Sequence, residues 1–235
     1  YPKLNRMKKY IALFLVSFQL FSQEKSRIIY SNETVSINSG KTLQVETFVS
    51  ESRAISKSKN TEEYSIRIPF DSFSEISNIK GSTFISRTNK TVDLSSFSIG
   101  TFDAEYENIY KSDNKYKFFV MPKVEDNSTI EFSYKSKLNE PRFLSSFRFQ
   151  NPIKTESAKF QIRCQSSTEI GYKLFGNHQD KIVFTKTTEG NLDIYTWEAK
   201  DIPEFEGEED MPSALYFMPH LIYYIKSYQI AGKKE

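Results

Sequence analysis

Apolar and polar residues alternate with a period of two along much of this chain. In residues 64–70 the large apolar side chains occupy every second position, with Ser65, Arg67 and Pro69 between them. Successive side chains of an extended chain point to opposite faces, so this pattern predicts a β-strand with one buried and one solvated face. The same pattern predicts strands in residues 43–49, 130–134, 143–149, 158–164 and 195–199.

Residues that favour turns separate these stretches. Asn, Asp, Ser and Gly lie between the apolar runs, whereas helical periodicity is nearly absent. We therefore predict an all-β protein that folds as an antiparallel two-sheet β-sandwich. Residues 50–60 are poor in apolar side chains and are interpreted as a hairpin tip or a loop. Residues 214–225 are strongly apolar and are predicted to form a final pair of buried strands.

The only tryptophan of the chain, Trp197, marks the centre of the predicted core. Tyr195, Trp197 and Ala199 share one face of an extended strand, so this face is predicted to be buried. A proline then ends the strand, because proline cannot donate to a sheet ladder. The acidic residues 204–210 follow it and are interpreted as an exposed crossing or as a docking edge for another domain.

The first 22 residues differ from the rest of the chain. Two lysines after Met7 precede an apolar run in residues 10–21, which is the layout of a secretory signal peptide. As a helix this run would rise only about 18 Å, short of the roughly 30 Å hydrocarbon core of a membrane. We therefore predict that residues 1–22 hold upstream residues and a signal peptide that is removed, leaving no transmembrane span. Residues 23–235 are predicted to form a single exported β-sandwich domain, undivided or made of two subdomains.

Charge and cysteine content narrow the possible partners. The chain has 32 Lys and Arg against 30 Asp and Glu, but four of the basic residues lie in the first 22 residues, which are predicted to be removed. The remaining 28 basic residues against 30 acidic ones give a formal charge of about −2, without the dense basic run that binds phosphates. No nucleic-acid partner is expected. The single cysteine cannot form an internal disulfide, so packing alone must stabilise the exported fold.

Few residues are candidates for catalysis or metal binding. The two histidines, His178 and His220, are interpreted as turn or surface residues, although a Ser-His-Asp arrangement would need one of them as its base. Cys164 lies on the apolar face of a predicted strand, so we expect a buried and unreactive thiol. The acidic residues 204–210 lack the ligand spacing of a calcium-binding EF-hand loop. We therefore predict no catalytic, cofactor-binding or metal-binding residue, and no cofactor.

Several blocks of the chain resemble, in order, those of a known family. They lie in residues 68–92, 117–134, 151–162 and 197–212. The second block is similar to F-x-x-P-x-V-x-x-G-S-x-I-E-Y-x-Y, and the last to A-x-x-I-P-x-F-x-x-E-x-x-M-P, both typical of the DUF3857 family. Asn127 replaces the glycine of the former motif, a tolerable change because asparagine also accepts a positive φ. The resemblance covers residues 45–230.

The resemblance implies an exported β-sandwich accessory domain, typical of Bacteroidota, that commonly precedes a transglutaminase-like domain. Any catalytic residues of the family lie in that following domain, and the chain ends at Glu235, where it would begin. We therefore expect no enzyme, but a non-catalytic accessory or interaction domain in the periplasm, at the cell surface or outside the cell. It would position a transglutaminase-like domain or another envelope protein.

Two alternatives stay open. A glycan- or peptide-binding module would show exposed coplanar tyrosines around a groove, and the chain has 14 tyrosines from which to build one. A hydrolase of unfamiliar design would show a pocket in which carboxylates with raised pKa converge. Each alternative therefore predicts a surface feature that the fold can reveal.

Overall fold

The computed structural model describes residues 25–104, 113–141, 144–207, 210–230 and 233–234. This part of the chain consists of β-strands, turns and short 3-10 helices. The predicted all-β class is therefore confirmed.

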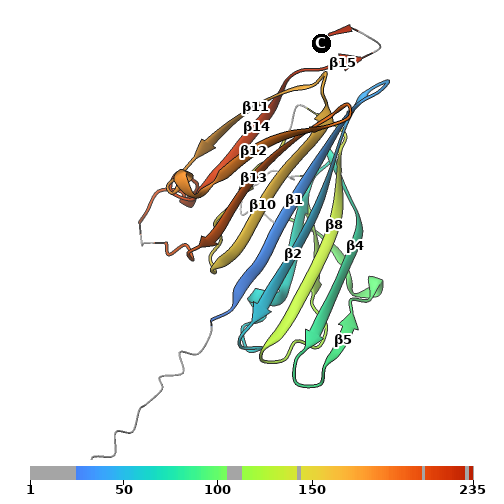
Figure 1. Cartoon of the computed structure of the whole chain (residues 1–235). Helices are drawn as coiled ribbons and strands as arrows, with labels where there is room; N and C mark the ends of the chain where they lie inside the picture. Colours follow the sequence, from blue (N-terminus) through green and yellow to red (C-terminus); the bar gives the residue numbers. More distant parts are fainter. Residues whose placement is uncertain (1–24, 105–112, 142–143, 208–209, 231–232, 235) are drawn as a thin grey trace, which may run out of the picture.

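Eight strands form one large sheet in which spatial order differs from sequence order (Figure 1). Across the sheet the order is β12 (Val183–Glu189), β13 (Leu192–Ile202), β10 (Thr155–Gln165), β1 (Arg27–Ser39), β2 (Leu43–Ile55), β8 (Ser128–Leu138), β4 (Ser74–Ile85) and β5 (Lys90–Asp93). Neighbouring strands are antiparallel except β1 and β10, which run parallel with Val35 opposite Ile162. The prediction of a purely antiparallel arrangement is therefore wrong. Parallel neighbours need a long crossover, and residues 40–154 supply it.

Two separate three-stranded sheets pack against the large sheet. One contains β3 (Ser65–Phe70), β7 (Lys115–Val120) and β6 (Gly100–Asp103), and the other β11 (Glu169–Phe175), β14 (His220–Ser227) and β9 (Ser146–Arg148). The remaining elements are a hairpin of β15 (Gln229–Ile230) and β16 (Lys233–Lys234) and the 3-10 helices η1 (Thr61–Tyr64), η2 (Ser96–Ser98), η3 (Gln179–Lys181) and η4 (Ala214–Tyr216). In the described part of the chain, no helix is long and apolar enough to cross a membrane.

Each small sheet encloses its own apolar cluster with the large sheet. In cluster 1, Phe160 and Trp197 of the large sheet pack with Tyr223 of β14. In cluster 2, Ile130 of the large sheet packs with Phe119 of β7. The described part of the chain therefore has two hydrophobic cores that share one long sheet.

The strand around Trp197 has the predicted orientation. Tyr195, Trp197 and Ala199 are 8%, 0% and 2% exposed, and all three belong to cluster 1. The strand ends at Ile202, directly before the proline. Of the acidic residues that follow, Glu206 is exposed, whereas Glu204 is half-buried and accepts a 2.6 Å hydrogen bond from Lys25.

Two predicted boundaries are wrong. Residues 50–55 continue β2 instead of forming a loop, because Glu51 and Arg53 occupy the covered face at positions where alternation predicts apolar side chains. Residues 214–225 contain one strand, β14, preceded by η4, because this 3-10 turn and Pro219 interrupt the apolar run. The predicted signal peptide lies outside the described residues.

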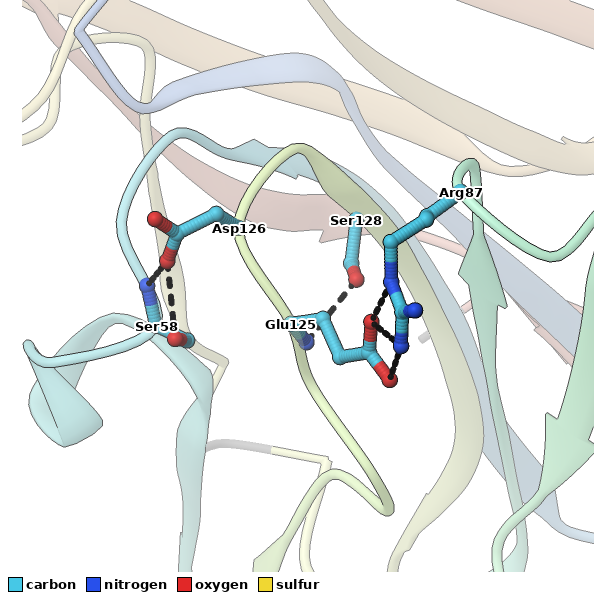
Figure 2. A network of polar contacts seen from close by, with 5 residues as sticks. All are labelled: Ser58, Arg87, Glu125, Asp126 and Ser128. Carbon is cyan, nitrogen blue, oxygen red and sulfur yellow. Dashed lines mark hydrogen bonds and ion pairs between the residues drawn. The ribbon is translucent and has the colours of Figure 1, made fainter.

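Side-chain hydrogen bonds fix the connection between β7 and β8 (Figure 2). Asp126 accepts two bonds of 2.8 Å from the backbone and hydroxyl of Ser58, and Glu125 accepts bonds of 2.9 and 3.2 Å from Arg87. The Glu125 N–H donates to the Ser128 hydroxyl at 3.0 Å. Asn127 has a φ of 61°, the left-handed conformation that the substituted glycine position requires. These bonds therefore tie the β7–β8 loop to the segment that follows β2 and to the turn between β4 and β5.

Candidate functional site

The inner face of the large sheet, which the two small sheets cover, becomes polar between the two clusters. Along β2, Val45 belongs to cluster 1 and Ile55 to cluster 2. Alternation places Glu51 and Arg53 on the same face between them. The neighbouring strand β1 carries Glu33 on this face. We call this region, defined by Glu33, Glu51 and Arg53, the central groove.

A cavity of about 680 Å³ opens in the central groove, between the large sheet and β3. Its lining includes Glu51 and Arg53 of β2, Tyr134 of β8 and four consecutive residues of β3, 65–68. Small-ligand sites in proteins typically measure about 300–1,000 Å³. The cavity is therefore large enough for a ligand group or for a segment of a peptide.

An ion pair forms part of the floor of this cavity. The Arg53 Nε donates to the Glu51 Oε1 at 2.6 Å, and the Arg53 Nη1 donates to the carbonyl oxygen of Glu63 at 2.8 Å. The guanidinium also lies 5.7 Å from the ring centre of Phe132. The Arg53 and Glu51 side chains are only 21% and 12% exposed. The two charges offset each other, and the hydrogen bonds hold both side chains in place on the floor.

Glu33 differs from this pair because, among the described residues, no cationic side chain lowers the pKa of its carboxyl. It lies opposite Val49 on one side and Phe160 on the other, both apolar. The residue is half-buried by surface area, but its carboxyl end is enclosed, and burial raises the pKa of this carboxyl to about 7. The cause is the loss of hydration by the charged form.

Two tyrosines lie close enough to Glu33 to be affected by its charge. Burial raises the pKa of Tyr134 on β8 and of Tyr223 on β14, and the negative charge of Glu33 raises both further. Both phenols therefore stay neutral near physiological pH. The groove thus combines one titratable carboxyl group with neutral aromatic side chains, a combination suited to binding a cationic or hydrogen-bonding group.

The predicted catalytic candidates lie away from the groove. Cys164 is at the far end of β10, in cluster 1, and His178 lies in a turn with a φ of 58°, as predicted. His220 is buried on β14, with its ring stacked on Phe175 and its Nδ1 2.9 Å from the carbonyl oxygen of Met218. The surface or turn position predicted for His220 is therefore wrong, because β14 begins directly at this residue.

Of the features expected for a hydrolase, the groove shows one carboxyl with a raised pKa, that of Glu33, while Glu51 is bound to Arg53. Within the described ranges, no three His, Cys, Asp or Glu side chains are placed to hold a metal ion. The acidic stretch 204–210 is only partly described, because residues 208 and 209 lie outside these ranges.

Cys164 is expected to resist modification in the folded protein. Its side chain is fully buried, and burial followed by the charge of Asp193 raises the pKa of the thiol to about 11. The reactive thiolate is therefore scarce as well as shielded. A thiol-specific colorimetric reagent should label native protein slowly and guanidinium-denatured protein at once. Complete labelling of the folded protein within minutes would contradict the burial of this residue.

The alternation of apolar and polar residues does not reveal the residues of the groove, because these residues depart from it. Glu33, Glu51 and Arg53 occupy inner-face positions that the pattern reserves for apolar side chains. Their spacing is the sequence signal that indicates them. Glu51 and Arg53 continue the alternation of residues 43, 45, 47 and 49, so they point to the same face of the strand. A polar residue in phase with a buried strand is a sign of a functional interior.

Comparison with known proteins identifies one family and one fold. Residues 42–206 match the DUF3857 family model, described as a domain of unknown function with a solved structure. The chain is similar to a candidate protease from Parabacteroides distasonis, with a TM-score of 0.73 and 14% identity over 86% of this chain and 41% of that one. An M1 zinc metallopeptidase from Deinococcus radiodurans matches with a TM-score of 0.38 and 8% identity over 86% of this chain and 43% of that one.

The chain thus spans less than half the length of either solved protein. At these identities the first likeness shows a shared fold. No curated protein matches the chain in sequence.

Proposed function

The chain belongs to the DUF3857 family, and on this premise we propose that it is a non-catalytic, exported accessory domain that positions a transglutaminase-like domain or another envelope protein. The observation that carries the proposal is the match to 41% of a longer protein, in which the same fold is one part of a larger chain. We further propose that the two small sheets act together as the second layer of a β-sandwich, since both pack on the large sheet.

The placement of the reactive residue types supports a non-catalytic role. Cys164 and His220 are both buried, and each hydrogen bonds to a nearby backbone carbonyl oxygen, that of Thr168 and that of Met218. An activated cysteine would need a base or a helix N-terminus beside an accessible sulfur. Neither residue contacts the central groove, so we assign the function to binding.

The DNA that follows codon 235 is the first test of this role. We expect the reading frame to continue into a transglutaminase-like domain. An immediate stop codon would contradict positioning of a domain in the same chain, and a following domain of another kind would contradict the transglutaminase-like partner.

Export is expected to remove the first 22 residues, because a basic start followed by a short apolar run directs secretion and cleavage. The intact mass of protein purified from the periplasm or the medium should then correspond to a chain that begins at Gln23. A cytoplasmic pool that keeps its complete N-terminus would contradict the prediction.

A peptide-binding module of the cell envelope is the second candidate. The central groove favours it over a glycan-binding module, because its cavity is bordered by β3, which pairs only with β7 among the described residues and so has an open edge. A glycan platform needs coplanar exposed rings, whereas the exposed rings of Tyr172 and Phe184 are tilted by 40° to each other. Binding to a purified set of envelope polysaccharides would favour the glycan reading instead.

A further inference from the structure

One edge of β3 is open in the described part of the chain, where β3 pairs only with β7. The N–H of Met121 donates to the carbonyl oxygen of Tyr64 at 3.0 Å. In an antiparallel ladder the hydrogen-bonded positions recur at every second residue, so the even-numbered residues of β3 bond to β7. The backbone N–H and C=O groups of Ser65 and Arg67 therefore point away from β7. Pro69, which has no N–H, occupies another odd position, as an open edge allows.

This open edge borders the cavity of the central groove. Residues 65–68 line the cavity along one side, and β2 and β8 of the large sheet form its floor. The backbone groups of Ser65 and Arg67 that β7 does not use thus lie where an added strand would find up to four hydrogen-bonding partners. Natural proteins usually block such edges, and here Pro69 blocks only the end of the strand.

The charge of the groove selects the chemistry of an added strand. The charged or titratable residues in the cavity lining are Glu51, Arg53, Tyr134, Glu62 of η1 and Arg67, whose guanidinium lies over the rings of Tyr116 and Phe118. Glu33 on β1 is not part of the lining but lies beside it, opposite the lining residue Val49, and its charge acts on Tyr134 and on Tyr223 of β14. The Glu51 and Arg53 charges cancel, and both tyrosines are neutral. Among the groups named here on the large sheet, Glu33 is therefore the one whose charge is not offset, and a cation placed beside it would replace its lost hydration.

We propose that the central groove binds an extended peptide segment that adds a strand to the open edge of β3 and directs a lysine or arginine side chain toward Glu33. Backbone hydrogen bonds to Ser65 and Arg67 supply the affinity, and the carboxylate selects the basic side chain, as in other cases of β-strand addition. The inference depends neither on export nor on a transglutaminase-like domain. Peptide binding can therefore fail while the proposed accessory role holds, and the accessory role can fail while peptide binding holds.

Synthetic pentapeptides test the selectivity. The probe is acetyl-Thr-Val-Lys-Val-Thr-amide, and its control carries glutamate in place of lysine. At about pH 8 we expect calorimetric titration to show the lysine peptide binding about tenfold more tightly. The variant Glu33→Gln should remove this preference and leave the weaker, backbone-dependent binding. Equal binding of the two peptides to the unmodified protein, or no binding of either at millimolar concentration, would overturn the proposal.

Two substitutions at one position test the strand addition. Arg67→Pro removes an N–H that β7 does not use, so the fold should persist, as it does with Pro69 two residues later. This variant should lose peptide binding, whereas Arg67→Thr, which keeps the N–H, should retain it. If Arg67→Pro fails to fold, a lysine peptide N-methylated at alternate residues takes its place, because it cannot complete the ladder on one edge. Full binding by Arg67→Pro or by the N-methylated peptide would overturn the strand addition.

The pH dependence supplies an independent readout. Between about pH 6 and pH 8 the affinity for the lysine peptide should rise, by up to about tenfold, as Glu33 ionises. In Glu33→Gln the affinity should not change over this range. The same rise in both proteins would assign the pH dependence to another group and overturn the role of Glu33.

Discussion

Replacement of Trp197 by alanine is expected to lower the free energy of unfolding by roughly 3–5 kcal/mol. The side chain is fully buried, and its ring centre lies 4.8 Å from that of Tyr172, 5.0 Å from that of Phe184 and 5.8 Å from that of Phe160. Because domains are stable by only about 5–15 kcal/mol, much of the variant should be insoluble. Urea unfolding followed by far-UV circular dichroism measures the loss, since the substitution removes the only tryptophan fluorophore.

Trp197→Phe is the matched control. The buried indole Nε1 has no hydrogen-bond partner in the described structure, and an unpaired buried donor itself costs about 1–3 kcal/mol. Phenylalanine keeps the aromatic contacts and removes this unpaired group, so the control should lose under about 2 kcal/mol. If Trp197→Ala lost less than about 1 kcal/mol, the tryptophan would not be part of the core, and the fold described for β13 would be wrong.

Glu33→Gln is expected to stabilise the protein at alkaline pH and to have little effect at acidic pH. The pKa of Glu33 in the folded protein is about 7, above the ordinary value of 4.5, so the folded state holds this proton more tightly than the unfolded state. Its contribution to stability is therefore full below about pH 4.5 and is lost as pH rises through about 7. One pKa unit corresponds to about 1.4 kcal/mol, which sets the loss at roughly 1–3 kcal/mol by about pH 8.

Chemical denaturation at several pH values between about 5 and 8 measures this effect. The free energy of unfolding of the parent should fall over this range. That of Glu33→Gln should fall by roughly 1–3 kcal/mol less. Glu46→Gln is a suitable control, because Glu46 is an exposed carboxylate on the next strand and its replacement should change stability by under about 0.5 kcal/mol. Identical pH profiles for the parent and for Glu33→Gln would show that the Glu33 carboxyl is hydrated.

The strands could be predicted from the sequence wherever one face is dry and the other is wet. Ile66 and Ile68 are buried on β3, and Phe160 and Ile162 are buried on β10, as their alternation indicates. Local backbone chemistry was also readable, since Asn127 has the positive φ inferred from the family's glycine. These features depend on neighbouring residues alone, so they leave a local signal.

The strand order and the groove could not be predicted in this way. The pairing of β1 with β10 joins Val35 to Ile162 across more than a hundred residues, and no local pattern specifies such a partner. The groove consists of polar residues at buried positions, where alternation predicts apolar side chains. Glu51 and Arg53 lie in the stretch that the sequence pattern interprets as a hairpin tip or a loop. Only the assembled sheet shows that Glu51 and Glu33 face inward together.

Amide hydrogen exchange along β3 tests the central claim, that the open edge of this strand is a binding site. In the free protein, the amides of Ser65 and Arg67 should exchange rapidly, and those of Ile66 and Ile68, which bond to β7, should be protected. Saturation with the lysine peptide should slow exchange at Ser65 and Arg67 and leave Ile66 and Ile68 unchanged. Protection of Ser65 and Arg67 in the free protein, or unchanged exchange of both at saturation, would contradict the account.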